Sequence, residues 1–171
     1  QRLGADGVKI HSTDFFNTEL HDAALSSMPC VFVSFGGIEM DELTAFLNAH
    51  SGPTLDKISL LFGFQAEPTP VESNNLLRLA ALKQHFPNIR FGFMDHACGK
   101  SDEGQTLALL ALPLGISCIE KHLTLDRLLE LEDYPSALAP QEFSQFVSRV
   151  RRLETAIGSS NLALTEQETG Y

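Results

Sequence analysis

The stretch IRFGFMDH, residues 89–96, is a short apolar run that ends in two polar side chains. Its isoleucine and phenylalanines favour a strand, and the run is too short for a typical helix. We therefore predict a buried strand over Ile89–Met94, with Asp95 and His96 at its carboxyl end.

Similar runs recur along the chain, and their starts lie 22 to 31 residues apart. The predicted strands are Val8–Ser12, Cys30–Ser34, Ile58–Phe64, Ile89–Met94 and Cys118–Leu123. Such intervals leave room for a crossover helix between parallel strands. The pattern is typical of an α/β protein.

Apolar residues at helical spacing predict helices in several of these intervals and after the last strand. The predicted helices are Glu39–His50, Glu72–Phe86, Asp102–Leu112 and Pro140–Ile157. In the last one, Pro140 suits the first turn and Gly158 suits the position just past the end. Residues 159–171 are polar and are predicted to be a linker or tail.

The length bounds the architecture, since 171 residues correspond to about one domain. Five strand–helix units suit either an open doubly wound sheet or part of a (β/α) barrel. A closed eight-fold barrel needs roughly 200 to 250 residues, so the chain is too short to be a whole one. In both architectures the chemistry lies at the carboxyl ends of the strands.

The composition excludes some classes of partner. The formal net charge is −10, which disfavours binding to duplex nucleic acid or to an anionic membrane. The longest apolar run, residues 107–116, is too short to span a bilayer, and no signal peptide is visible. Three cysteines without a CxxC pair indicate a reducing compartment, so we expect a cytoplasmic protein.

Three strand ends carry groups suited to an anion or a metal ion. Lys9 and Ser12 could together hold an anion, although on spacing alone a solvent-facing lysine and a capping serine are favoured. His96 and His122 end neighbouring predicted strands and could bind a divalent ion, oriented by Asp95 or Glu120. Spacing alone supports a purely structural role for these histidines equally well.

Other polar residues give weaker signals. Asp133 lies in an acidic loop and could act on a substrate, although such runs are more often solvated surface. No role is assigned to His11, His21, His50 or His85, and His11 is the least certain because it lies near a strand end. The common nucleotide-binding fingerprints are absent from the sequence.

Three motifs resemble the sialic acid synthase family, which includes N-acetylneuraminate synthases and the spore coat polysaccharide biosynthesis protein E group. They are FQAEPTP (residues 64–70), GFMDH (92–96) and IEKHLT (119–124). Their order and spacing match over nearly the whole chain, from Lys9 to Pro140. The resemblance implies a TIM barrel, with residues 1–158 forming its C-terminal five or so strand–helix units.

The resemblance also implies a reaction, the condensation of phosphoenolpyruvate with an N-acetylated amino-sugar aldehyde to give a sialic-acid-like nonulosonic acid. It places a divalent ion, typically manganese, on His96 and His122, and a catalytic role at Asp133 in the sugar site. Phosphoenolpyruvate would be held by Lys9, Ser12, Ser34 and Gln65. The intact protein is expected to be a homodimer.

The chain departs from the family pattern at positions that would touch substrate. Glu67 replaces a tyrosine, Gln65 replaces an asparagine, and Met94 replaces a serine. These changes favour either a different acceptor sugar or a non-catalytic barrel kept for sugar binding or assembly. A different metal-dependent barrel aldolase is a third hypothesis.

Overall fold

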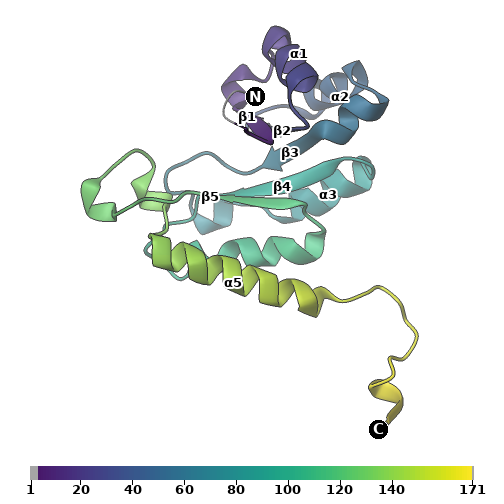
Figure 1. Cartoon of the computed structure of the whole chain (residues 1–171), viewed down its shortest axis with the longest axis vertical. Coiled ribbons are helices and arrows are strands. Elements are labelled where there is room, and N and C mark those ends of the chain that lie inside the picture. The colour runs from purple at the N-terminus through teal and green to yellow at the C-terminus, as the bar shows by residue number, and fades with distance from the viewer. Residues whose placement is uncertain (1–3, 171) are drawn as a thin grey trace.

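The computed structural model describes residues 4–170 and contains one sheet of five parallel strands (Figure 1). The strands are β1 (Gly7–Ile10), β2 (Cys30–Ser34), β3 (Ile58–Phe62), β4 (Arg90–Asp95) and β5 (Cys118–Lys121). Each strand pairs with the next along the chain, so the sheet order equals the chain order. All five predicted strands are confirmed, and their ends differ from the predicted ends by at most two residues.

Helices connect the strands and follow the last one. The α-helices are α1 (Thr18–Ser27), α2 (Met40–Ala49), α3 (Leu77–His85), α4 (Glu103–Thr106) and α5 (Pro140–Ile157). Short 3₁₀ helices occupy Ser12–Asp14, Gly52–Lys57, Val71–Ser73, Leu107–Leu114, Arg127–Leu129, Tyr134–Ser136 and Glu168–Gly170. The prediction for Pro140–Ile157 is confirmed at both ends.

Two predicted helices have the wrong extent, and one helix, α1, was not predicted from the sequence. α3 begins at Leu77 and not at Glu72, because Asn75 takes a left-handed conformation with φ of 46° that interrupts a helix. The helix predicted over residues 102–112 becomes the short α4 followed by a 3₁₀ helix that contains Pro113. α1 was not assigned, although Asn17 caps it by accepting a hydrogen bond from the backbone of Leu20.

The register of the sheet sorts side chains onto two faces. Residues paired across parallel strands point the same way, and successive residues point to opposite faces. One face is apolar and packs against the helices, through the buried residues Ile10, Val31, Val33, Ile58, Leu60, Phe91 and Phe93. We call this the outer face and the opposite one the inner face.

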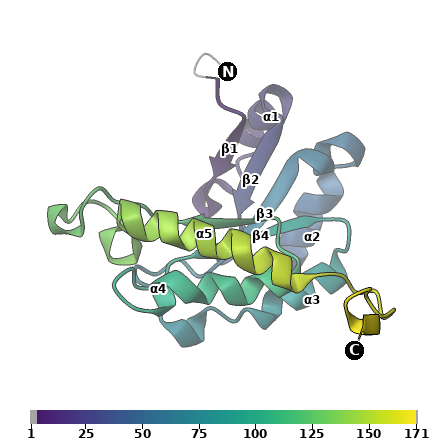
Figure 2. The same ribbon diagram turned by 60° about the horizontal axis from the view of Figure 1, so that its bottom comes forward.

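The sheet curves strongly, with its inner face on the concave side (Figure 2). In a flat sheet, the two edge strands β1 and β5 would lie roughly 19 Å apart. Instead Lys9 Nζ on β1 lies 2.5 Å from Glu120 Oε1 on β5, so the inner faces of the edge strands approach each other. Sequential strand order, this curvature and helices packed on the outer face indicate part of a barrel and argue against a doubly wound sheet.

A buried ion pair joins the last two strands on the outer face. Lys121 Nζ lies 3.0 Å from Asp95 Oδ2, and the two side chains are 1% and 0% exposed. The other carboxylate oxygen of Asp95 accepts a hydrogen bond from the backbone of Ala97 at 2.9 Å. The pair therefore fixes the backbone immediately before His96 and His122.

Beyond α5, residues 159–170 are exposed and extend away from the body of the protein (Figure 1). This stretch is the predicted tail. The described residues leave out Tyr171, at the end of the tail, and residues 1–3 of the predicted barrel segment. None of the helices in residues 4–170 combines the length and apolar character that crossing a membrane requires.

Removing one partner of the buried ion pair should destabilise the protein strongly. We expect Lys121→Met to lower the free energy of unfolding by about 3 to 5 kcal/mol, because it leaves the Asp95 carboxylate buried without a countercharge. The double variant Asp95→Asn with Lys121→Met should recover most of this loss, since the amide oxygen can still accept from Ala97. Urea unfolding followed by circular dichroism measures both.

The exposed Lys100→Met serves as the control, with an expected change within about 0.5 kcal/mol. If Lys121→Met and the control had equal free energies of unfolding, the buried ion pair would not contribute to the stability of the fold.

Candidate metal centre

His96 and His122 lie side by side at the carboxyl ends of β4 and β5. Met94 pairs with Glu120 in the parallel register, so the residues two positions further along each strand lie on the same face. The two imidazole rings have their centroids 5.0 Å apart and are tilted by 46°. The structure therefore brings together the two histidines that were predicted to bind a metal.

A carboxylate from the loop after β3 faces both rings. Glu67 Oε1 lies 3.4 Å from Nε2 of His96 and 3.4 Å from Nε2 of His122. One potential ligand atom from each of the three residues lies within 4.8 Å of the other two. We call these residues the Glu67–His96–His122 cluster.

The electrostatics of the cluster favour a metal ion. Burial, with a smaller contribution from His122, lowers the pKa of His96 to about 4, so its imidazole is neutral near pH 7. Burial raises the pKa of the Glu67 carboxyl above its ordinary value. Neutral imidazole is the form that binds metals, and an added cation would favour the ionised carboxylate.

One unsatisfied nitrogen of the cluster also favours a bound ion. In the part of the chain that the structure describes, Nε2 of His122 and Nδ1 of His96 are buried without a hydrogen-bond partner. Buried polar atoms usually have a partner, so each unpaired nitrogen calls for an explanation. A divalent ion bound to the cluster would satisfy the His122 nitrogen, and the residues present therefore fit such an ion.

The backbone of His96 is held in place from two loops. Its carbonyl oxygen accepts hydrogen bonds from Ser136 Oγ at 2.8 Å and from the backbone nitrogen of Thr69 at 2.9 Å. Asp133 lies on the other side of His122, with Oδ2 3.6 Å from Nδ1 of that ring. The predicted catalytic aspartate thus lies beside the cluster and half-exposed.

Three of the residues predicted to bind phosphoenolpyruvate lie near the carboxyl ends of the strands: Lys9 on the inner face of β1, Ser12 just after β1 and Gln65 in the loop after β3. Ser12 Oγ donates to Gln65 Oε1 at 2.9 Å, and the amide nitrogen of Gln65 lies 3.1 Å from Nε2 of His11. Lys9 is held by Glu120, and the charges of both act on the pKa of His96. Ser34 lies on the same face of β2 as the register places Lys9 on β1, but it is fully buried and donates to the carbonyl of Ile10 at 3.4 Å.

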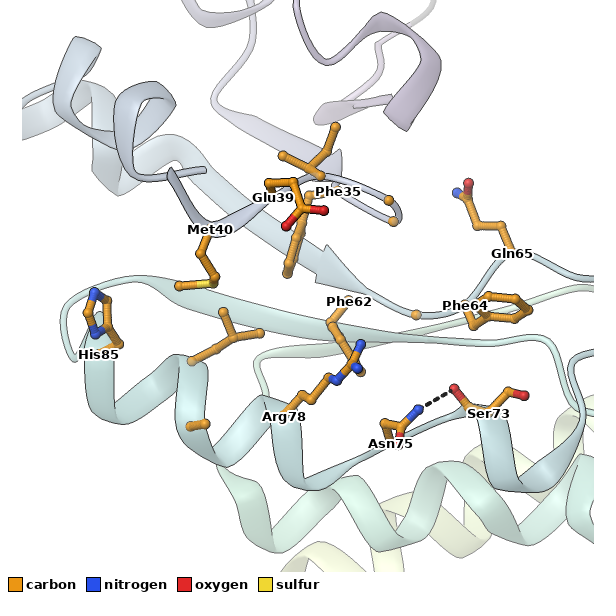
Figure 3. A pocket seen from close by; sticks show the side chains of 16 residues that line it. Phe35, Glu39, Met40, Phe62, Phe64, Gln65, Ser73, Asn75, Arg78 and His85 are labelled. Carbon is orange, nitrogen blue, oxygen red and sulfur yellow. Dashed lines mark hydrogen bonds between the residues drawn. The ribbon is translucent and has the colours of Figure 1, made fainter. Parts of the chain in front are cut away.

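Gln65 also lies at the rim of a separate cavity of about 1040 Å³, between α2 and α3 (Figure 3). Glu39 and Met40 of the α2 side face Asn75 and Arg78 of the α3 side across it. No member of the Glu67–His96–His122 cluster lines this cavity.

The structure corrects one part of the predicted site and adds to it. Neither Asp95 nor Glu120 forms an ion pair or hydrogen bond with an imidazole, because the first is taken by Lys121 and the second by Lys9. The sequence reasoning assigned no role to His11 and treated Glu67 only as a departure from a family pattern. The alternation of strand positions could have placed His11 on the face of Lys9, whereas no sequence signal indicated where Glu67 points.

Comparisons with known proteins place the chain in a family. The model of the NeuB family matches residues 1–161. The N,N'-diacetyllegionaminic acid synthase of Campylobacter jejuni is 30% identical over 158 residues, covering 91% of this chain and 46% of that protein. A pseudaminic acid synthase of the same species is 37% identical over 102 residues, covering 60% of this chain and 28% of that protein.

A solved structure confirms the fold. The N-acetylneuraminic acid (sialic acid) synthetase of Leptospira borgpetersenii, crystallised with citrate, superposes with a TM-score of 0.84 at 27% identity. The match covers 99% of this chain and 57% of that one. The chain spans less than half the length of the two Campylobacter relatives, and its curved sheet is part of a TIM barrel.

Removal of both imidazoles should weaken metal binding strongly. We expect the double variant His96→Ala with His122→Ala to weaken Mn²⁺ binding by more than about tenfold, since even changes to residues around a metal's ligands cost that much. Isothermal titration calorimetry without substrate measures the affinity. His85→Ala, which removes an exposed histidine at the end of α3, is the matched control, and equal affinities in the two variants would contradict the assignment.

Proposed function

The chain belongs to the NeuB family, and on this basis we propose that it is part of a synthase that condenses phosphoenolpyruvate with an N-acetylated amino-sugar aldehyde. The product would be a sialic-acid-like nonulosonic acid. One observation carries the proposal: the Glu67–His96–His122 cluster, Lys9, Ser12 and Gln65 all lie at or just beyond the carboxyl ends of the strands, which is the end where barrel chemistry takes place. We further propose that the whole protein works in the cytoplasm as a homodimer.

Lys9, Ser12 and Gln65 suit the anionic substrate. Phosphoenolpyruvate carries phosphate and carboxylate oxygens, which bind well to an ammonium group and to neutral hydrogen-bond donors. Lys9 is paired with Glu120, so its ammonium would exchange that carboxylate for the substrate. Ser34 is retained as a proposed binding residue, and it would have to turn from the carbonyl of Ile10 to reach the substrate.

His96 and His122 are proposed to hold a divalent ion, Mn²⁺ by the resemblance. When bound, such an ion acts as a Lewis acid that polarises the sugar carbonyl. Asp133 lies at the rim of the cluster, where its carboxylate could accept a hydroxyl hydrogen bond from the sugar and orient it. The buried side of His96 keeps water away from that half of the site.

The overall reaction balances without a redox partner. C3 of phosphoenolpyruvate forms a bond to the aldehyde carbon, and water adds to C2. The carbonyl at C2 of the product is then formed as inorganic phosphate leaves. Phosphate release is therefore the signature of this reaction.

A second candidate function is a non-catalytic barrel that binds sugar or serves assembly. Met94 favours it: this side chain is fully buried on the inner face, where the family pattern has a serine hydroxyl. A thioether is a weak acceptor and supplies no donor for a phosphate oxygen. The two candidates differ in turnover and not in fold.

The decisive assay is phosphate release from phosphoenolpyruvate by the whole gene product that contains this chain, with Mn²⁺ and a panel of N-acylated amino-sugar aldehydes. We expect release that depends on the aldehyde. Sugar binding without any release would favour the non-catalytic barrel, and carbon–carbon cleavage without release would favour an aldolase.

Lys9→Met should impair the use of phosphoenolpyruvate in the same assay. Loss of a charge-assisted contact of about 1.5 to 3 kcal/mol predicts a KM for phosphoenolpyruvate raised about tenfold or more. The KM for the aldehyde should change little. Lys100→Met removes an exposed lysine and is the control; equal KM values for phosphoenolpyruvate would contradict the role of Lys9.

A further inference from the structure

We propose that Glu67 is a third protein ligand of the divalent ion, so that the site is a two-histidine, one-carboxylate centre. The inference rests on the proposed function only in taking His96 and His122 to hold an ion, which its test measures directly. It assigns a metal-binding role to a residue at which the family pattern has a tyrosine.

The distances from Glu67 to the two imidazoles suit ligands that share an ion. Nitrogen and oxygen ligands of transition metals lie about 2.0 to 2.2 Å from the metal. Two such ligands are therefore about 2.8 to 3.1 Å apart at octahedral angles and about 3.3 to 3.6 Å apart at tetrahedral angles. Glu67 Oε1 lies 3.4 Å from each imidazole nitrogen, which is longer than a typical N–H···O hydrogen bond.

The carboxylate oxygen of Glu67 is placed symmetrically with respect to the two imidazoles. The same carboxylate oxygen is equally far from Nε2 of His96 and Nε2 of His122. A hydrogen bond from one ring would draw the carboxylate toward that ring. An oxygen placed evenly between two nitrogens matches a group that shares a central cation with both.

No lysine or arginine in the described part of the chain forms an ion pair with this carboxylate. Within residues 4–170, the ion-pair contacts of Glu67 are the two imidazoles, while the nearby Lys121 is paired with Asp95 and Lys9 with Glu120. The Glu67 side chain is 28% exposed, so it is partly removed from water as well. A divalent ion would supply the missing positive charge.

The third ligand has chemical consequences for the site. A carboxylate oxygen is a harder donor than imidazole and suits Mn²⁺, and two histidines with one carboxylate form a known binding pattern for divalent iron. Three protein ligands leave open positions for water and substrate oxygens. Glu67 should therefore let the protein retain its ion when no substrate is bound.

The test compares Mn²⁺ binding by the whole protein and its variants, without substrates, by calorimetry and by electron paramagnetic resonance of free Mn²⁺. Glu67→Gln keeps the size of the side chain but removes its charge, and Glu67→Tyr installs the residue of the family pattern. We expect both to weaken Mn²⁺ binding about tenfold or more. Glu72→Gln, which changes an exposed glutamate in the same loop, should bind as the unaltered protein does.

Direct ligation has a spectroscopic signature of its own. With ¹³C in the glutamate carboxyl groups, bound Mn²⁺ should show a carbon hyperfine coupling that Glu67→Gln abolishes and Glu72→Gln keeps. Urea unfolding of each variant shows whether the fold is retained. Should one Glu67 variant fail to fold, the other still gives the affinity.

The outcomes separate the two proposals. If Mn²⁺ binds with equal affinity to the unaltered protein and to Glu67→Gln, and only the double histidine variant loses it, the role of Glu67 is overturned and the histidine site remains. If the unaltered protein binds no Mn²⁺, the metal site of the proposed function fails together with this inference.

Discussion

The in-register pairing of five parallel strands is the constraint on which the site depends. Because paired residues point the same way and successive residues alternate, one face of the sheet is committed to the helices. Polar groups can then gather on the other face without disturbing the core. Lys9 and Glu120 meet there from opposite edges of the sheet, and His96 and His122 meet at its end.

The curvature of the sheet brings the side chains of the inner face close enough together to form a site. A flat sheet would separate the anion-binding side chains of β1 from the imidazoles of β4 and β5, whereas the observed curvature lets the charges of Lys9 and Glu120 act on His96. On the helix side, the buried pair of Asp95 and Lys121 ties together the two strand ends that carry the histidines. A buried pair adds little net stability, but it is costly to break, so it makes alternative registers of these strands unfavourable.

The sequence predicted the strands well, because short apolar runs rich in β-branched and aromatic residues recur at crossover spacing. It predicted the helices less evenly: a left-handed Asn75 and the internal Pro113 changed two of them, and both effects depend on local conformation more than on apolar spacing. The two imidazoles of the candidate metal centre were predicted from their places at neighbouring strand ends. Asp95 and Glu120, however, pair with lysines: Asp95 is adjacent to His96 and so points to the opposite face, whereas Glu120 shares the inner face with the imidazoles but is held by Lys9.

The sequence by itself determined the parallel α/β framework, the strand ends that carry polar groups, and the motifs that mark the NeuB family. These follow from local composition and from the period of two along a strand. Only the tertiary structure decided that Glu67 faces both imidazoles and that His11 joins Gln65. Such contacts depend on the path of a loop and on the curvature of the sheet, which are set by packing between residues far apart in the chain.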